Sequence, residues 1–178
     1  MDSSDNRILL HTCCGPCGAP AVERLLQQEN DVLLFFSNSN IFPEEEFGKR
    51  VETVRRMAAH FKVPLIIDRY DHFSWLEAVQ GYEHEPEKGR RCALCFAYSL
   101  TRTAARAEKL GIPSFTTTLT LSPHKPSPLI FSIGERFPGF LSENFKKRDG
   151  FRRSVELSSE LELYRQDYCG CEFSMRRP

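Results

Sequence analysis

Short apolar runs alternate along the chain with longer segments whose apolar residues recur at helical spacing. Bounded apolar runs predict buried strands, and four are found, at residues 7–11, 32–36, 64–67 and 115–121. Apolar residues three or four positions apart predict helices that begin near Pro16 and near Pro43, and a third helix over residues 91–110. Gly111 and Pro113 provide the stop signal for that third helix.

This alternation indicates an α/β fold, because a strand, a helix and a parallel strand form a right-handed crossover unit. We expect a parallel sheet with flanking helices in a single domain over residues 1–178, about the length of one domain. Pro123, Pro126 and Pro128 predict a stiff loop after the fourth strand. Ligands bind at the carboxyl ends of such strands, and residues 13–17 directly follow the first strand.

Charge and hydropathy limit which partners and which cellular compartment the protein can have. Lys plus Arg and Asp plus Glu both number 24, so any contact with a polyanion must use a local patch. Residues 1–6 lack the apolar core of a signal peptide, and the apolar-leaning run at 32–42 is too short to cross a bilayer. The sequence therefore predicts a cytoplasmic protein without a membrane partner.

Seven cysteines give the strongest chemical signal. They form three groups: Cys13, Cys14 and Cys17; Cys92 and Cys95; Cys169 and Cys171. In a reducing cytosol such groups favour metal or redox chemistry over structural disulfides. Cys92 and Cys95 lie one turn apart at the start of a predicted helix, a spacing that suits one metal ion or two irons of a cluster.

Two simpler functions must be weighed against an iron–sulfur enzyme. Cys14-Gly15-Pro16-Cys17 has the active-site pattern of a thioredoxin-like thiol–disulfide protein, but Cys13 stands where tryptophan is usual and five other cysteines would have no role. A zinc-binding module needs four ligands, commonly as two paired knuckles. Seven cysteines in three unequal groups fit an iron–sulfur cluster with further thiols better.

Several segments resemble the QueH family of cobalamin-independent epoxyqueuosine reductases. The resemblance rests on residues 11–17, 91–95 and 163–174, with residues 116–119 and 122–125 also at the expected places. It implies a three-layer, adenine-nucleotide α-hydrolase-like (HUP or PP-loop-like) fold. It also implies a reaction in which the epoxide of epoxyqueuosine in tRNA becomes the alkene of queuosine, with loss of oxygen.

The resemblance also implies a ligand set for a [4Fe-4S] cluster: Cys13, Cys14, Cys92 and Cys95. It leaves Cys169 and Cys171 for catalysis, either as a redox-active disulfide or, with Asp167, as ligands of a second iron ion. Cys17 could join either metal site or merely pack. The electron donor is expected to be ferredoxin-like or a chemical reductant.

An ATP-dependent tRNA-modifying enzyme of the PP-loop group is the remaining alternative. Such enzymes carry a Gly/Ser-rich phosphate loop after the first strand, where this chain has residues 13–17 with three cysteines. Contacts with tRNA require local basic residues. The candidates are Arg90, Arg91, residues 146–148, Arg152, Arg153, Arg176 and Arg177, together with His124 and Lys125.

Overall fold

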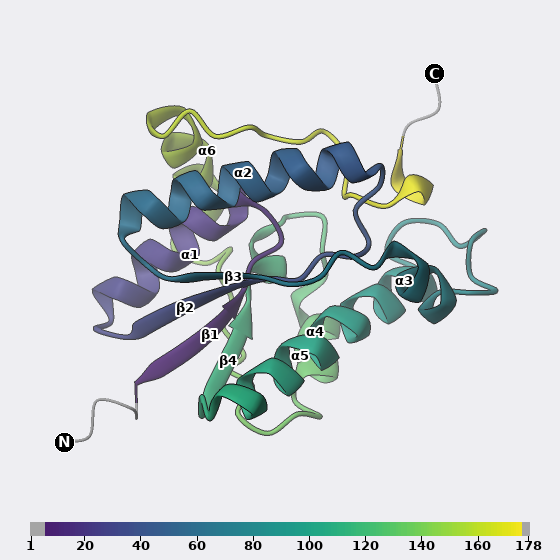
Figure 1. Ribbon diagram of the computed structural model, residues 1–178, viewed down its shortest axis with the longest axis horizontal. Coiled ribbons are helices and arrows are strands. Elements are labelled where there is room, and N and C mark those ends of the chain that lie inside the picture. The colour runs from purple at the N-terminus through teal and green to yellow at the C-terminus, as the bar shows by residue number, and fades with distance from the viewer. Residues whose placement is uncertain (1–5, 176–178) are drawn as a thin grey trace.

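The computed structural model describes residues 6–175 and has a parallel sheet at its centre (Figure 1). Its four strands lie in the order β3-β2-β1-β4. They are β1 (Arg7–His11), β2 (Asp31–Phe36), β3 (Leu65–Ile67) and β4 (Ser114–Thr117). Every neighbouring pair is parallel. The strand order reverses between β1 and β4, which is where an open α/β sheet forms its ligand crevice.

Helices cover both faces of the sheet. They are α1 (Gly15–Gln27), α2 (Glu44–Phe61), α3 (His72–Ala78), α4 (Arg90–Leu110), α5 (Ser127–Gly134) and α6 (Gly150–Glu160), with 3₁₀ turns η1 (Thr118–Leu121) and η2 (Glu172–Ser174). Alternate residues of a strand point to opposite faces. Ile8 and Leu10 of β1 pack with α1, α2 and α6, whereas Leu9 packs with α4 and α5. The expected three-layer α/β fold is confirmed.

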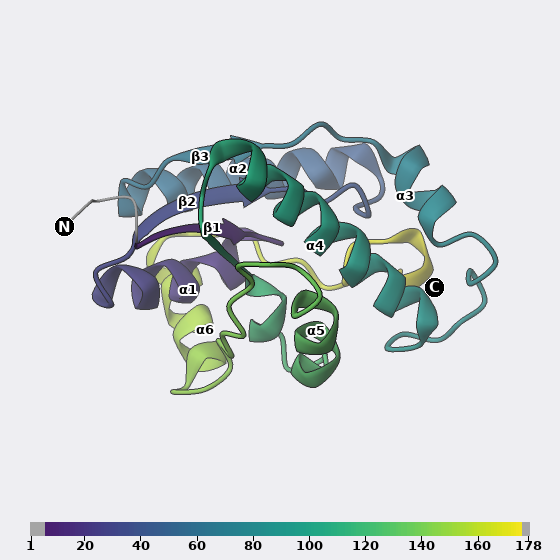
Figure 2. The same ribbon diagram turned by 90° about the horizontal axis from the view of Figure 1, so that it is seen from below.

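The C-terminal segment after α6 returns across the carboxyl edge of the sheet. Figures 1 and 2 show this yellow segment beside α3 and the beginning of α4. Cys171 is buried there against Trp75 of α3, with Leu94 and Cys95 of α4 packed around them. The last cysteines of the chain are thus brought to the same edge as the first ones.

The structure differs from the sequence prediction at the fourth strand. β4 ends at Thr117, because the Thr117 hydroxyl accepts a hydrogen bond from Leu119 N at 3.1 Å and turns residues 118–121 into η1. The predicted stiff loop is also shorter than expected, because Ser127 begins α5 with Pro128 in its first turn, a position that proline tolerates. Helices α3, α5 and α6 were missed.

No described helix combines the length and the apolar composition needed to span a membrane.

Candidate metal and redox centre

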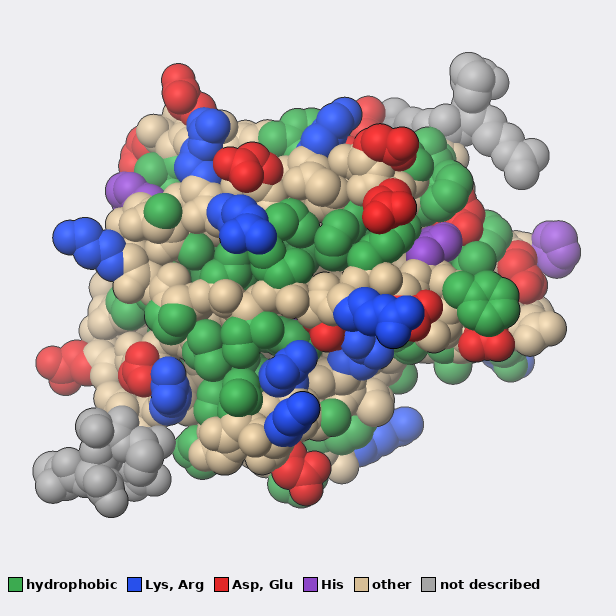
Figure 3. Space-filling model, in the orientation of Figure 1, with side chains coloured by type: hydrophobic (Ala, Val, Ile, Leu, Met, Phe, Trp, Pro, Cys, Tyr) green, Lys and Arg blue, Asp and Glu red, His purple; other side chains and the backbone are tan. Residues whose placement is uncertain are grey.

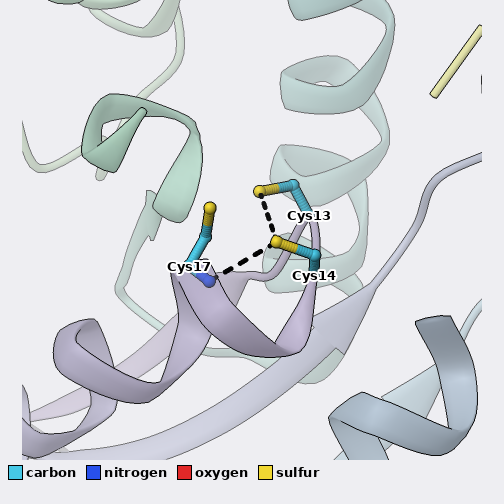
Figure 4. A group of neighbouring side chains, drawn as sticks. All are labelled: Cys13, Cys14 and Cys17. Carbon is cyan, nitrogen blue, oxygen red and sulfur yellow. Dashed lines mark hydrogen bonds between the residues drawn. The ribbon is translucent and has the colours of Figure 1, made fainter. Parts of the chain in front are cut away.

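The first cysteine group lies at the point where the strand order reverses. Cys13 follows β1, and its backbone N–H donates to Thr118 Oγ1 at 3.0 Å, beside the end of β4. Cys14 is the N-cap of α1, and its Sγ accepts from Cys17 N at 3.4 Å. The Sγ atoms of Cys13 and Cys14 are 4.0 Å apart, and all three sulfurs lie within 4.8 Å of one another (Figure 4).

One thiol of this group is the preferred site for a negative charge. Hydrogen bonds from Cys13 and then Cys17 hold the pKa of Cys14 well below its ordinary value, against the effect of burial. The hydrogen bond with Cys14 is the main cause that raises the pKa of Cys13, and the hydrogen bonds with Cys13 and Cys14 raise the pKa of Cys17. The N-terminus of α1 also favours an anion at this place. A single thiolate shared by three sulfurs is well prepared to bind a cationic metal.

The second group joins α4 to the C-terminal segment. Burial is the main cause that raises the pKa of Cys92, Cys95 and Cys171, and the neighbouring sulfur of Cys169 raises each of them further. Lys88 N donates to Cys92 Sγ at 3.3 Å. No disulfide joins any of the seven cysteines in this structure, and Cys169 is exposed whereas Cys171 is buried.

Two adjoining cavities connect the groups. The larger has a volume of about 450 Å³ and is lined by five cysteines: Cys17, Cys92, Cys95, Cys169 and Cys171. Cys13 lines the smaller cavity, which shares Cys95, Cys169 and Lys125 with the larger one. Asp167, exposed to solvent, also lines the larger cavity. Six cysteines therefore line two adjoining cavities at the carboxyl edge of the sheet.

Lys125 is a basic residue that lines both cavities. Burial by itself lowers the pKa of its ammonium group, but the sulfurs of Cys169, Cys13, Cys17 and Cys14 raise it above the ordinary value. It was predicted to contact tRNA together with His124. The structure places the half-buried Lys125 toward the cysteines, whereas His124 is exposed at the cavity wall.

The buried side chain of His11 connects the carboxyl ends of three strands. It is fully buried, and burial is the main reason that its pKa is lowered. A neutral imidazole has one N–H, and Ser37 O can only accept, so Nε2–H donates to that carbonyl at 3.1 Å. Nδ1 then accepts from the Thr117 hydroxyl at 2.8 Å. The ring thereby joins the end of β1 to the end of β4 and to Ser37, which follows β2.

A buried ion pair on α2 anchors the C-terminal cysteines. Arg50, only 2% exposed, donates to Glu46 Oε1 at 2.7 Å and to the carbonyl of Cys169 at 2.9 Å. It also donates to the carbonyl of Tyr168 at 3.3 Å. The Tyr164 hydroxyl donates to Glu46 Oε2 at 3.0 Å. In the sequence, the only signal of this pair is an i, i+4 spacing that is usually found on solvated helix faces, so the pair was not predicted.

Gly170 is required by the same contacts. Its φ is +144°, a backbone conformation that side chains rarely adopt. A Cβ atom there would lie 3.1 Å from Asn40 Nδ2 and 3.2 Å from Arg50 Nη1. Its carbonyl accepts from Phe42 N at 2.8 Å. The glycine between the two cysteines therefore lets the segment lie directly on α2 and the loop before it.

The structure corrects one of the predicted tRNA contacts. Arg91 is 2% exposed, donates to the carbonyls of Glu83 and Glu85, and lies over the Phe173 ring at 5.1 Å. Arg91 is thus buried, and its guanidinium group connects the loop before α4 to the C-terminal segment. It cannot form part of a basic surface in this conformation.

The other basic candidates differ in exposure and in whether their charge is paired with a carboxylate. Arg153 bridges three glutamates, Glu23 at 2.8 Å, Glu160 at 3.1 Å and Glu156 at 3.2 Å. Lys146 donates to Ser127 Oγ at 3.0 Å. The exposed candidates are Arg90, Lys147, Arg148 and Arg152, whereas Arg176 and Arg177 lie outside the described residues. Figure 3 shows basic and acidic side chains interspersed on the face that it displays, in keeping with the balanced charge.

Comparisons with known proteins identify the family. The family model "Epoxyqueuosine reductase QueH" matches residues 8–177. Curated relatives of that name include proteins from Streptococcus pyogenes (38% identical, 95% of this chain and 70% of the relative) and Haemophilus influenzae (36%, 99% and 74%). A third comes from Thermotoga maritima (38%, 94% and 90%). Together with cysteines gathered at the end of β1, these matches show that the chain belongs to the epoxyqueuosine reductase QueH family.

Proposed function

We propose that the chain reduces epoxyqueuosine in tRNA to queuosine, as the names of its relatives describe for them. The observation that carries this proposal is the convergence of six cysteines on two adjoining cavities at the carboxyl edge of the sheet. The reaction breaks both C–O bonds of an epoxide, forms a C=C bond and releases water, consuming two electrons and two protons. A site rich in thiols is suited to supply both.

The residues fit a sulfur-bound iron group. Free thiols from three parts of the chain face the cavities, and Cys14 is poised to be a thiolate. A [4Fe-4S] cluster takes about four cysteines, and the set that we propose is Cys13, Cys14, Cys92 and Cys95. Support for this set comes from Cys13 and Cys95, which line the same small cavity although they belong to different groups. When bound, the cluster would supply electrons to the epoxide.

Cys169 and Cys171 are proposed to act beyond this ligand set. Their oxidation to a disulfide would release two electrons and two protons, which balances the reduction of one epoxide to an alkene and water. An external, ferredoxin-like or chemical donor would then restore the dithiol. The alternative is a second iron ion held by this pair with Asp167, and Cys17 could serve either site. Cys169 is free and exposed, which supports accessibility to a donor or substrate.

Lys125 is proposed to stabilise negative charge in the site. It lines both cavities beside Cys13 and Cys169. A cation fixed in a water-poor cavity stabilises a developing alkoxide far more than one in bulk water. Its role here is to hold the anionic sulfurs and to face the oxygen that leaves the substrate. With a tRNA substrate, the cytoplasm is the compartment that we propose.

Metal analysis tests the ligand set directly. Anaerobic reconstitution with iron and sulfide should give a brown protein with about four irons and four sulfides per chain. Cys92→Ala or Cys95→Ala should remove the cluster absorbance and epoxide reduction together. A colourless variant that keeps full activity would contradict the assignment. Zinc at one ion per chain, with no iron taken up, would favour a structural metal site instead.

A further inference from the structure

The mouth of the large cavity carries an exposed aromatic side chain that the redox chemistry does not use. Phe151, in the first turn of α6, is 45% exposed and lines the cavity. Gly150 fixes the direction of the chain before it, because a Cβ atom there would lie 1.8 Å from the carbonyl oxygen of Phe145. Phe151 thus lines the cavity from the first turn of α6 and stays exposed.

A guanidinium group lies beside this ring. Arg165 Nη1 donates to three oxygens of α6: Ser158 Oγ at 2.9 Å, Ser154 Oγ at 3.2 Å and Ser154 O at 3.3 Å. Its Cζ lies 5.9 Å from the centroid of the Phe151 ring. Ser154 in turn donates to Pro16 O at 2.7 Å, which ties this wall to the beginning of α1 beside the first cysteines.

We infer that Phe151, supported by Arg165, is a stacking platform for a nucleobase of a single-stranded RNA loop at the cavity mouth. This inference rests on the proposed function, since the cavity must admit a base of tRNA. Unpaired bases stack on aromatic side chains and on arginine planes, whereas bases inside a duplex are already stacked and inaccessible. A cavity of about 450 Å³ falls within the range that holds a small molecule or a single base.

The charges near the ring fit RNA better than an apolar partner. Lys147 and Arg148 are exposed within four residues of Phe151. Arg152 is also exposed, with Asp149 at 3.5 Å and Glu156 at 3.6 Å offsetting part of its charge. An exposed aromatic ring with exposed basic residues near it in the chain is an arrangement that proteins use for single strands, where a charged groove follows the backbone and rings stack on the bases.

RNA binding by matched variants tests the platform. Fluorescence anisotropy of a labelled RNA hairpin with a single-stranded loop should show that Phe151→Ala weakens binding by about 5- to 150-fold, which corresponds to about 1–3 kcal/mol per stacked base. Phe151→Trp should bind about as tightly as the wild type, and Phe151→Leu should resemble Phe151→Ala. Val155→Ala is the control, because Val155 is equally exposed, one turn along α6, and does not line the cavity.

A blunt RNA duplex of equal length separates stacking from charge. Duplex binding should be weak and unaffected by Phe151→Ala, and in turnover the variant should raise KM much more than it lowers kcat. Equal hairpin binding by the wild type and Phe151→Ala, or full retention in Phe151→Leu, would overturn the inference while leaving the proposed function intact. A wild-type protein that binds neither RNA but takes up iron would overturn the tRNA substrate and the platform together.

Discussion

Removing the Arg50 guanidinium should detach the C-terminal cysteines from α2. In Arg50→Met, the Glu46 carboxylate stays buried, with its side chain 7% exposed, and the Tyr164 hydroxyl is the one donor that residues 6–175 still offer it. The carbonyls of Tyr168 and Cys169 lose their donor as well. Breaking one side of a buried ion pair costs about 3–5 kcal/mol. The carbonyls add less than a buried group would, because Cys169 is exposed and water can reach it.

Urea unfolding followed by the fluorescence of the single tryptophan, the buried Trp75, would measure this loss. We expect the free energy of unfolding to fall by about 3–5 kcal/mol, with faster amide exchange at residues 168–171. Arg56→Met is the control. Its side chain is 52% exposed and 3.8 Å from Glu162, and such a pair contributes less than about 1 kcal/mol.

A double variant checks the cause. Arg50→Met with Glu46→Leu removes both charges, so it should recover much of the stability that the single variant loses, while the cysteine segment stays detached. A change of less than about 1 kcal/mol in Arg50→Met, or normal exchange at residues 168–171, would refute the role of this ion pair.

Three further predictions concern other contacts. Cys169→Ser should abolish epoxide reduction while most iron–sulfur absorbance survives, and complete loss of absorbance would instead make Cys169 a cluster ligand. Gly170→Ala should lower the free energy of unfolding by about 1–3 kcal/mol because φ of Gly170 is positive. Gly48→Ala, where a Cβ would contact nothing within 4 Å, should not lower it. Equal losses for the two variants in urea unfolding would contradict the strain at Gly170. A hydrogen bond from Arg153 lowers the pKa of Glu23, so the Glu23 carboxylate stabilises the fold above its ordinary pKa of 4.5, and this stabilisation is lost as the pH falls further. Glu23→Gln should therefore reduce the dependence of the free energy of unfolding on pH in the acid range. An unchanged pH dependence would contradict this role of the Arg153–Glu23 pair.

The centre of the sheet could be predicted from sequence because β1 and β2 are short, largely apolar runs whose residues are buried on both faces. Ile8 to Leu10 and residues 32–36 leave no other location for their side chains than a core. Helix α3 was missed because it has only seven residues, and α6 because most of its residues are polar. Both are held by contacts distant in sequence, such as those of Trp75 with Cys171 and of Ser154 with Pro16. A local sequence pattern cannot predict contacts between residues that are distant in the sequence.

The cysteines themselves were found from sequence, since their spacing is local. Their three-dimensional grouping was not. The structure brings Cys17 to within 4.8 Å of Cys13 and Cys14, although its role was left open, and it places Cys92 and Cys95 beside the C-terminal pair. Arg91 was predicted as a surface residue because a run of basic residues gives no sign that one of them faces inward. Arg50 gave no sign that its partners lie at residues 168 and 169.

Nucleoside mass spectrometry after one turnover tests the central claim most directly. Anaerobically reconstituted protein, reduced with excess dithionite and mixed with tRNA that contains epoxyqueuosine, should convert the modified nucleoside to queuosine. Cys95→Ala, treated in the same way, should leave epoxyqueuosine unchanged. Conversion by Cys95→Ala at the wild-type rate, or no conversion by an iron-loaded wild-type protein that binds the tRNA, would contradict the account.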